Sequence, residues 1–346
     1  MKFLLTIIQA VGLGCASAAA GRRVLHYLQL ESYQLPGYVK SVRRNAMRAL
    51  IPPIAMAAVG VAALRLSGLT GLALLLEALT AALLVWQAAK EKAKKPFVAT
   101  ERVKRLLAVH VAVNTVLALA LLTVSPVLGY LMPAFEPALL MLAALIAAPM
   151  EEHIAGQFIK DAQARLAAQP GLIKIGITGS YGKTSTKFLL RDILSVKYNV
   201  LATPSSFNTT MGVTRVIREQ LTPAHQVFIA EMGARHVGDI KELVELVHPS
   251  MGLITSVGPQ HLDTFGTIER VRDTKYELID GLPKDGTAIF ARDGAICEEL
   301  YARCPLEHRY MPGMLVDAKE IASGPWGTRF TLVDTRTGEQ APCQTR

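Results

Sequence analysis

A glycine-rich stretch that ends in basic and hydroxyl side chains, "GITGSYGKTSTK", occupies residues 176–187. Peptide N–H groups around Gly179 and Gly182, together with the start of a following helix, can surround phosphate oxygens. Lys183 can reach the terminal phosphates of a nucleotide, and the Thr184 hydroxyl can ligate Mg²⁺. These residue types in this order predict a binding site for ATP and Mg²⁺.

The spacing of this stretch departs from the strict phosphate-loop pattern G-x-x-x-x-G-K-[ST], because the first glycine position holds Ile177. The shorter pattern G-x-x-G-K-T remains, with an apolar run before it and a helical pattern after it. Ser180 and Ser185 are the other side chains of the loop that we expect to contact the nucleotide. A purely structural glycine-rich turn is the alternative interpretation.

Polar side chains also follow other apolar runs in the second half of the chain. Glu231 ends the run "QVFIAE", where a carboxylate beside a phosphate loop can hold Mg²⁺ directly or through water. His261 follows the run "MGLITSV", and Lys275 lies in the helical pattern after it. A lone His or Lys at such a position is usually a surface or capping group. Convergence on one sheet edge would make both of them site residues.

The elements that must position these side chains are short β-rich runs alternating with helical patterns. This alternation predicts an α/β P-loop domain, a mostly parallel sheet with helices on both faces, whose sites gather at the carboxyl ends of the strands. A β-hairpin region is expected over residues 328–342. The expected strands are Leu172–Thr178, Asn199–Thr203, Gln226–Glu231, Met251–Val257 and Thr287–Ala291.

The first half of the chain reads as an α-helical transmembrane bundle, because a helix needs about 20 apolar residues to cross the hydrocarbon of a bilayer. Pro133, Glu136 and Pro137 interrupt the last of its five apolar stretches. We therefore expect a membrane domain over residues 1–150, an amphipathic connector over 151–170 and the ATP-binding domain over 171–346. The apolar stretches are Phe3–Ala20, Leu50–Leu69, Leu69–Ala89, Leu106–Val124 and Val127–Met150.

Basic residues of the linkers predict the orientation. Up to Met150 the chain has 15 Lys and Arg against 5 Asp and Glu, whereas the remainder has 22 against 23. This excess suits basic loops beside anionic lipid, and it argues against a nucleic-acid surface. An outside N-terminus and five crossings would make this a multi-pass plasma-membrane protein with a cytoplasmic ATP-binding domain. The basic linker residues are Arg22, Arg23, Lys40, Arg43, Arg44 and Arg48, then Lys90, Lys92, Lys94, Lys95, Arg102, Lys104 and Arg105.

Three further features of the sequence bear on the membrane and redox predictions. The first apolar stretch could instead be a cleaved signal peptide, although cleavage would leave a basic stretch outside. Glu77 could be a functional intramembrane carboxylate, or it could pair with Arg65, His110 or another polar group of the bundle. The four cysteines lack metal-ligand spacing and read as free thiols: Cys15, Cys297, Cys304 and Cys343.

The segment from about Leu172 to Asp293 resembles the central ATP-binding domain of the Mur ligases. The resemblance rests on "TGSYGKTSTK", "SFNTTMGV", "EMGARHVGDI" and "TSVGPQHLDTFGTIERVRDTKYEL", in that order. It is most similar to the MurF type, which adds D-alanyl-D-alanine to UDP-N-acetylmuramoyl-tripeptide. It implies an ATP-dependent amide-forming ligase of peptidoglycan precursor synthesis, in which a peptide carboxylate attacks the γ-phosphate and an amine then attacks the resulting acyl phosphate.

The resemblance also implies roles for individual residues. Lys183 and Thr184 would hold the ATP phosphates and a Mg²⁺, and Glu231 would ligate metal. His261 would ligate a second Mg²⁺, and Lys275 matches a lysine that is carbamylated in this family. The residues that match a segment near the substrate are Asn208 and Thr209.

The sequence departs from the family pattern in three respects. Ser256 stands where an Asn is usual, and the membrane half replaces the uridine-binding domain. The chain also stops at Arg346, before the adenine-side Asn motif and the C-terminal domain of the family. We therefore keep two alternatives, a truncated non-catalytic ATP-binding membrane protein and a P-loop ATPase coupled to transport.

Overall fold

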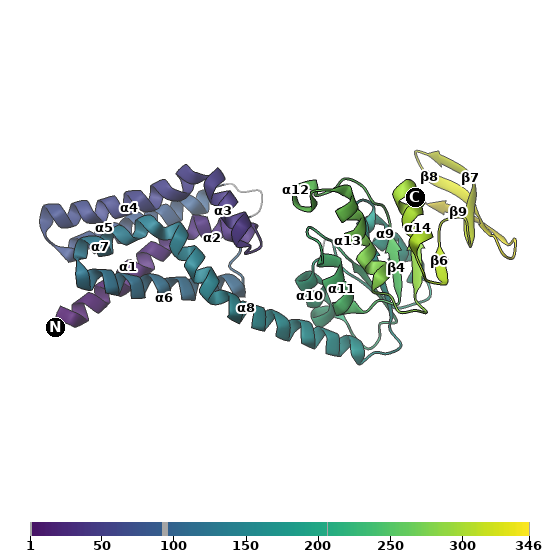
Figure 1. Cartoon of the computed structure of the whole chain (residues 1–346), viewed down its shortest axis with the longest axis horizontal. Coiled ribbons are helices and arrows are strands. Elements are labelled where there is room, and N and C mark those ends of the chain that lie inside the picture. The colour runs from purple at the N-terminus through teal and green to yellow at the C-terminus, as the bar shows by residue number, and fades with distance from the viewer. Residues whose placement is uncertain (1, 92–95, 206, 346) are drawn as a thin grey trace. The chain divides into compact units, whose positions relative to one another are not determined.

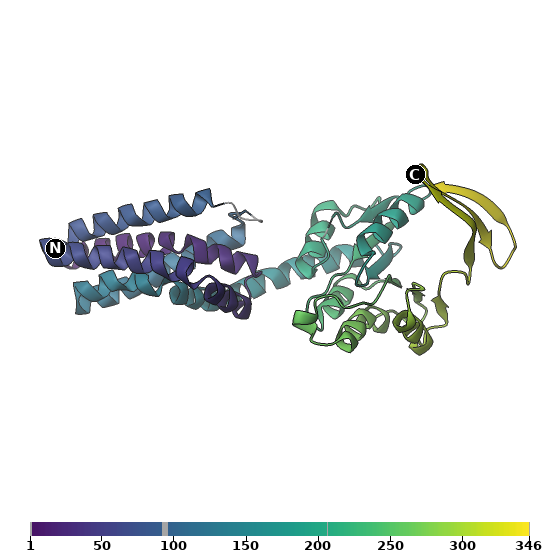
Figure 2. The same cartoon turned by 90° about the horizontal axis from the view of Figure 1, so that it is seen from above.

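The computed structural model describes residues 2–91, 96–205 and 207–345 of the chain. They form two compact units, Met1–Ile154 and Ala155–Arg346, which Figures 1 and 2 show from two directions. Some residues that entered the sequence arguments lie outside the described ones. They are Lys92, Lys94 and Lys95 of one basic linker and Ser206 of the motif "SFNTTMGV".

The first unit is helical in all of its regular elements (Figure 1, purple to teal). Five helical segments in the described ranges are long and apolar enough to cross a membrane by length and composition, beginning at Lys2, Ala46, Thr70, Glu101 and Pro126. The elements are α1 (Lys2–Ala20), α2 (Arg22–Leu30), α3 (Leu35–Arg44), α4 (Ala46–Ser67), α5 (Thr70–Lys90), α6 (Glu101–Val124), α7 (Pro126–Leu131), the 3₁₀ turn η1 (Met132–Phe135) and α8 (Glu136–Ala167).

Small residues hold this bundle together while large apolar ones face outward. A Cβ atom at Gly14 of α1 would lie 2.4 Å from Thr115 Oγ1 of α6, so glycine allows the two helices to approach closely. Leu75, Trp86 and Leu145 are all more than half exposed. The outer surface of the described helices thus carries large apolar side chains.

The fifth apolar stretch, Val127–Met150, is interrupted, as its prolines predicted. It consists of α7, the turn η1 and the start of α8. Pro133 and Pro137 lack the N–H groups that a continuous helix would need at these positions. The expected connector is the second half of α8, which runs without a break to Ala167.

Glu77 does not pair with Arg65 or His110. Both of its carboxylate oxygens are buried and lack a hydrogen-bond partner among the described residues. His110 lies instead beside Glu136, with Nε2 2.7 Å from Oε1. The period of an apolar helix shows which face is buried, but it does not show which polar groups of different helices meet.

The second unit is built on a parallel sheet of six strands in the order β2-β3-β1-β4-β5-β6. The expected parallel α/β architecture is confirmed, and β6 is an addition to it. The strands are β1 (Ile173–Thr178), β2 (Val200–Ala202), β3 (Val227–Glu231), β4 (Met251–Ile254), β5 (Thr287–Phe290) and β6 (His308–Tyr310). The helices are α9 (Lys183–Leu194), α10 (Thr210–Gln220), α11 (Asp239–Val247), α12 (Leu262–Phe265), α13 (Ile268–Asp280) and α14 (Ala295–Arg303).

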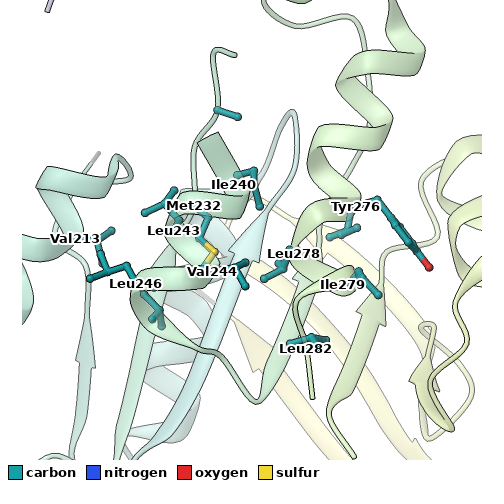
Figure 3. Packing of buried hydrophobic residues seen from close by; sticks show 14 of the residues in the cluster. Val213, Met232, Ile240, Leu243, Val244, Leu246, Tyr276, Leu278, Ile279 and Leu282 are labelled. Atoms are coloured by element: carbon teal, nitrogen blue, oxygen red, sulfur yellow. The ribbon is translucent and has the colours of Figure 1, made fainter. Parts of the chain in front are cut away.

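Both faces of the sheet are covered by apolar side chains of these helices. Figure 3 shows Ile240, Leu243 and Val244 of α11 and Leu278 and Ile279 of α13 gathered over one face. On the other face, a separate cluster is formed by strands β1 and β3 with α9. Its members are Ile175, Ile177, Val227 and Ile229, with Leu190 and Leu194 packed against them.

The chain continues into a second, antiparallel sheet in the order β7-β8-β9, formed by β7 (Val316–Gly324), β8 (Gly327–Asp334) and β9 (Gln340–Thr345). The β8–β9 pair corresponds to the expected hairpin region. Strand β7 was not predicted, because nearly all of its side chains are exposed and show no apolar alternation. The candidate site lies at the carboxyl ends of β1, β3 and β4 in the larger sheet.

Candidate functional site

The glycine-rich stretch forms the loop between β1 and α9, as expected. Gly179 and Gly182 have positive φ angles of +148° and +79°. A Cβ atom at Gly179 would lie 2.1 Å from Thr255 Oγ1. Both the backbone conformation and the close neighbour therefore require glycine here, and the loop stays narrow enough for N–H groups to point into it.

Side chains that follow β4 fix this loop from the other side. The N–H of Tyr181 donates to Ser256 Oγ at 2.7 Å, and the N–H of Ser180 donates to Ser256 O at 2.8 Å. Ser180 Oγ donates to Gly258 O at 2.9 Å, and Thr255 Oγ1 donates to Tyr181 O at 2.6 Å. Ser256 thus anchors the phosphate loop, a role that sequence reasoning did not assign to it.

Lys183 is folded over the loop that precedes it. Its Nζ donates to Gly179 O at 2.6 Å and to Ser180 O at 3.2 Å. Burial lowers its pKa, and the carboxylate of Glu231 opposes that shift. The ammonium group therefore lies over the loop. A bound phosphate would offer it charged oxygen acceptors in place of the two carbonyl oxygens.

Glu231 stands at the centre of the site. Its Oε2 accepts from Thr184 Oγ1 and from Lys187 Nζ, each at 2.9 Å, and its Oε1 accepts from Asn208 Nδ2 at 3.1 Å. The N–H of Glu231 donates to Thr203 Oγ1 at 3.1 Å. Thr184 and Asn208 therefore both lie within hydrogen-bond distance of the Glu231 carboxylate.

Lys187 was missed in the sequence analysis. It is completely buried, and its Nζ also donates to Ser205 O at 2.7 Å. A signal was available, because Lys187 lies four residues after Lys183 and therefore on the same face of α9. A buried lysine so close to the phosphate loop needs an anionic partner, and Glu231 supplies it.

The donor set around Glu231 fits Mg²⁺. A hydroxyl and a carboxylate are the hard oxygen ligands that Mg²⁺ takes in nucleotide sites, where phosphates and water complete the octahedron. No group of three or more His, Cys, Asp and Glu side chains suited to a metal occurs among the described residues. Thr184 and Glu231 fit a metal that arrives with a nucleotide better than one held by protein ligands alone.

His261 and Lys275 lie within electrostatic reach of each other and of Lys183. Burial lowers the pKa of Lys275 to about 8, and the positive charge of Lys183 adds to this effect. Burial, Arg235 and Lys275 lower the pKa of His261. His261 is the N-cap of α12, with a left-handed backbone (φ 54°) and an exposed side chain. It belongs to no group of three or more metal-binding side chains in the described ranges.

The remaining candidates occupy the start of helices. Thr209 caps α10, because its Oγ1 accepts from the N–H of Gly212 at 3.3 Å. Ser185 lies exposed in the first turn of α9. The backbone carbonyl of Asn208 also accepts a hydrogen bond at 2.8 Å from the N–H of Gly233, in the loop after β3. Capping accounts for the position of Thr209 without a substrate.

Comparison with known proteins identifies the domain type. Residues 177–343 match the model of the Mur ligase middle domain. The chain is 40% identical over 129 residues to UDP-N-acetylmuramoyl-tripeptide--D-alanyl-D-alanine ligase of Synechocystis sp.. This match covers 37% of this chain and 28% of that protein. It is 42% identical over 123 residues to the ligase of the same name from Mycobacterium bovis, covering 36% of this chain and 24% of that protein.

A solved structure agrees with these sequence matches. The crystal structure of MurF from Acinetobacter baumannii superposes with a TM-score of 0.51 at 28% identity, over 55% of this chain and 42% of that chain. The expected resemblance to the central domain of the Mur ligases is therefore confirmed. The match spans only about a quarter of the length of the two curated relatives, 28% and 24% respectively.

Proposed function

We propose that the α/β unit binds Mg·ATP and uses it to activate a carboxylate for amide-bond formation in peptidoglycan precursor synthesis. The proposed substrates are UDP-N-acetylmuramoyl-tripeptide and D-alanyl-D-alanine, which appear in the names of the similar ligases. The observation that carries the proposal is the polar cluster of Glu231 with Thr184, Lys187 and Asn208, beside a glycine loop that Lys183 covers.

The residues of the site suit a transfer of the γ-phosphoryl group to a carboxylate. Loop N–H groups would cradle the phosphates, and Lys183 would leave its two carbonyl partners to neutralise charge on the phosphates. Thr184 and Glu231 would hold Mg²⁺, whose positive charge stabilises the phosphate oxygens when it is bound. The activated acyl phosphate would then be attacked by the amine of the second substrate, and phosphate would leave.

Lys275 is suited to carbamylation, which needs a neutral amine to attack CO₂. Its pKa of about 8 leaves an appreciable neutral fraction near neutral pH, because burial disfavours the charged form. A carbamate there would replace a positive charge with a negative one beside Lys183 and His261. This change would turn the group into an acceptor that can orient His261 or a metal.

We also propose that the helical unit anchors the protein in the plasma membrane with the α/β unit in the cytoplasm. The five candidate spans and their outward-facing leucines support insertion in a bilayer. The basic linkers support the orientation, because Lys and Arg accumulate on the cytoplasmic side. Alkaline extraction of membranes from cells that express the chain tests this idea, and release of the protein into the supernatant would contradict it.

The enzymatic proposal is tested by phosphate release from ATP in the presence of UDP-N-acetylmuramoyl-tripeptide, with and without D-alanyl-D-alanine. We expect release that requires both substrates and that is lost in the Lys183→Ala variant. Release stimulated by neither substrate would contradict the ligase. The variant must retain wild-type circular dichroism, so that loss of release reports on the phosphate site and not on unfolding.

A further inference from the structure

The helical unit buries a second polar cluster that the proposed ligase chemistry does not use. Glu136, at the start of α8, accepts a hydrogen bond at Oε2 from Ser17 Oγ of α1 at 2.7 Å. Its Oε1 lies 2.7 Å from His110 Nε2 of α6. All three side chains are 0% exposed in a bundle of candidate membrane spans. Ionisable groups at such positions are costly and commonly mark ion or proton sites.

Other buried polar atoms near this cluster also lack hydrogen-bond partners among the described residues. Asn114 Oδ1, both ring nitrogens of His110 and Glu136 Oε1 are buried without a hydrogen bond of good geometry in the described ranges, although His110 Nε2 and Glu136 Oε1 lie 2.7 Å apart. Asn114 uses its Nδ2 to donate to His110 O at 2.9 Å. A purely structural pair would be expected to have its second imidazole nitrogen fixed by a partner, because an open buried nitrogen costs free energy. Nδ1 of His110 therefore has an unused hydrogen-bonding position inside the bundle.

A small cavity is lined both by Glu136 and by basic residues of the bundle. Its volume is about 10 Å³, which is close to the room that one water molecule needs. Glu136, Arg23 and Arg48 are its charged lining residues. Gly21 also lines it, and a Cβ atom at Gly21 would lie 2.2 Å from Glu136 Oε1. A side chain at Gly21 would therefore collide with this carboxylate oxygen.

A proline pair in α4 supplies further polar atoms to the cavity. Pro52 and Pro53 have no N–H groups, so the carbonyls of Arg48 and Ala49 lose their helical donors. The guanidinium of Arg23 donates to Arg48 O at 3.0 Å and satisfies one of them. Ala49 is also among the residues that line the cavity. A water molecule between Glu136, Ala49 and Arg23 would have the several polar partners that buried water requires.

We propose that Glu136 and His110 form a proton-binding site in the helical unit, reached through the cavity beside Arg23 and Arg48. A carboxylate beside a neutral imidazole carries one negative charge, and uptake of one proton gives a neutral pair of carboxyl and imidazole. The incoming proton comes from water in the cavity, which regains a proton from the medium. The other groups that face the pair are Ser17 from α1, Asn114 from α6 and Tyr38 from α3, whose hydroxyl donates to Pro137 O at 2.8 Å.

Infrared difference spectroscopy of the full chain in lipid nanodiscs, recorded as the pH is lowered, tests the proposal. We expect a carboxyl C=O band to appear on acidification in sodium-free buffer and to be lost in Glu136→Gln. Glu77→Gln is the matched control, since Glu77 is equally buried but has no basic partner among the residues that the structure describes. The control should leave the acid-induced band unchanged.

A second variant covers the case in which Glu136→Gln fails to fold. Gly21→Ala keeps both titrating groups but places a methyl group against Glu136 Oε1, so the band should move to a different pH. A band that survives Glu136→Gln, or a folded Gly21→Ala variant with an unshifted titration, would overturn the proposal. Displacement of the titration by Na⁺ would overturn it in favour of a metal-cation site. The ATP site is assayed separately, so either result leaves that proposal unaffected.

Discussion

Lys187 Nζ and Glu231 Oε2 lie 2.9 Å apart, and both side chains are almost completely buried in the α/β unit. Removing two such charges from water is costly, and their attraction offsets that cost only when further hydrogen bonds satisfy both groups. Ser205 O completes the partners of Lys187, while Thr184 and Asn208 complete those of Glu231. The pair therefore fixes the orientation of the carboxylate that we assign to Mg²⁺.

Breaking this pair should destabilise the α/β unit strongly. Lys187→Met leaves Glu231 buried without its cation, and we expect a loss of about 3–5 kcal/mol in free energy of unfolding. Pulse proteolysis of the α/β unit in urea measures this change. Arg191→Met is the matched control on the same helix, because its ion pair with Asp192 is exposed and should contribute less than about 1 kcal/mol. Equal urea midpoints for the two variants would refute the importance of the buried pair.

Ser256 should matter for nucleotide binding although it does not face the phosphates in our assignment. Ser256→Ala removes the acceptor of the Tyr181 N–H, and an unpaired, partly buried N–H costs about 1–3 kcal/mol. We expect the dissociation constant of Mg·ATP to rise by about tenfold for each 1.4 kcal/mol lost. Equilibrium binding of Mg·ATP to the full chain measures it.

Two further variants make this result specific to the anchoring of the loop. Ser256→Asn keeps an acceptor and carries the residue usual in the resembling family, so it should bind more tightly than Ser256→Ala. Ser195→Ala changes an exposed serine at the end of α9 and should have no effect. The anchoring role would be wrong if Ser256→Ala bound Mg·ATP as tightly as Ser195→Ala.

Lys275 should make the stability of the α/β unit depend on pH in the alkaline range. Its pKa falls from 10.5 to about 8 on folding, chiefly through burial. Between these values the unfolded chain binds more protons than the folded one, so stability rises as the pH increases from about 8 to about 10.5. Below pH 8 both states are protonated, and the burial of the charge is a constant penalty.

Lys275→Met should therefore raise stability at pH 7 and flatten its increase at alkaline pH. Urea midpoints of the wild type and the variant at several pH values, read by pulse proteolysis in CO₂-free buffer, measure the difference. Exclusion of CO₂ prevents carbamylation, which would change the charge. The same alkaline increase in both proteins would show that Lys275 is not the responsible group.

The larger sheet was predictable because its strands are continuous apolar runs, as strands buried on both faces require. Strand β6 was missed because "HRY" is short and polar, and β7 because its exposed side chains leave no period. The proximity of Thr184 and Glu231 was predictable, because the carboxyl ends of neighbouring parallel strands lie at the same edge of a sheet. The positions of Lys187 and Ser256 depend on side-chain packing between elements, which spacing alone does not reveal.

In the helical unit, too, the sequence pattern predicted the helices but not the contacts between them. Apolar length was enough to locate the candidate spans, and Pro133 and Pro137 marked the break that the structure places before α8. The pairing of Glu136 with His110 was not foreseen, since the two residues lie on different helices. Which helix faces meet is decided by small residues such as Gly14 and Gly21, whose missing side chains permit close approach.

Trapping of the acyl phosphate by hydroxylamine tests the central claim most directly. A carboxylate activated at this site should be captured as a hydroxamate when the chain is mixed with Mg·ATP, UDP-N-acetylmuramoyl-tripeptide and hydroxylamine, without D-alanyl-D-alanine. The account predicts a hydroxamate of the tripeptide that requires ATP and disappears in Lys183→Ala. A wild-type protein that binds Mg·ATP and the tripeptide but yields no hydroxamate above the level of that variant would contradict it.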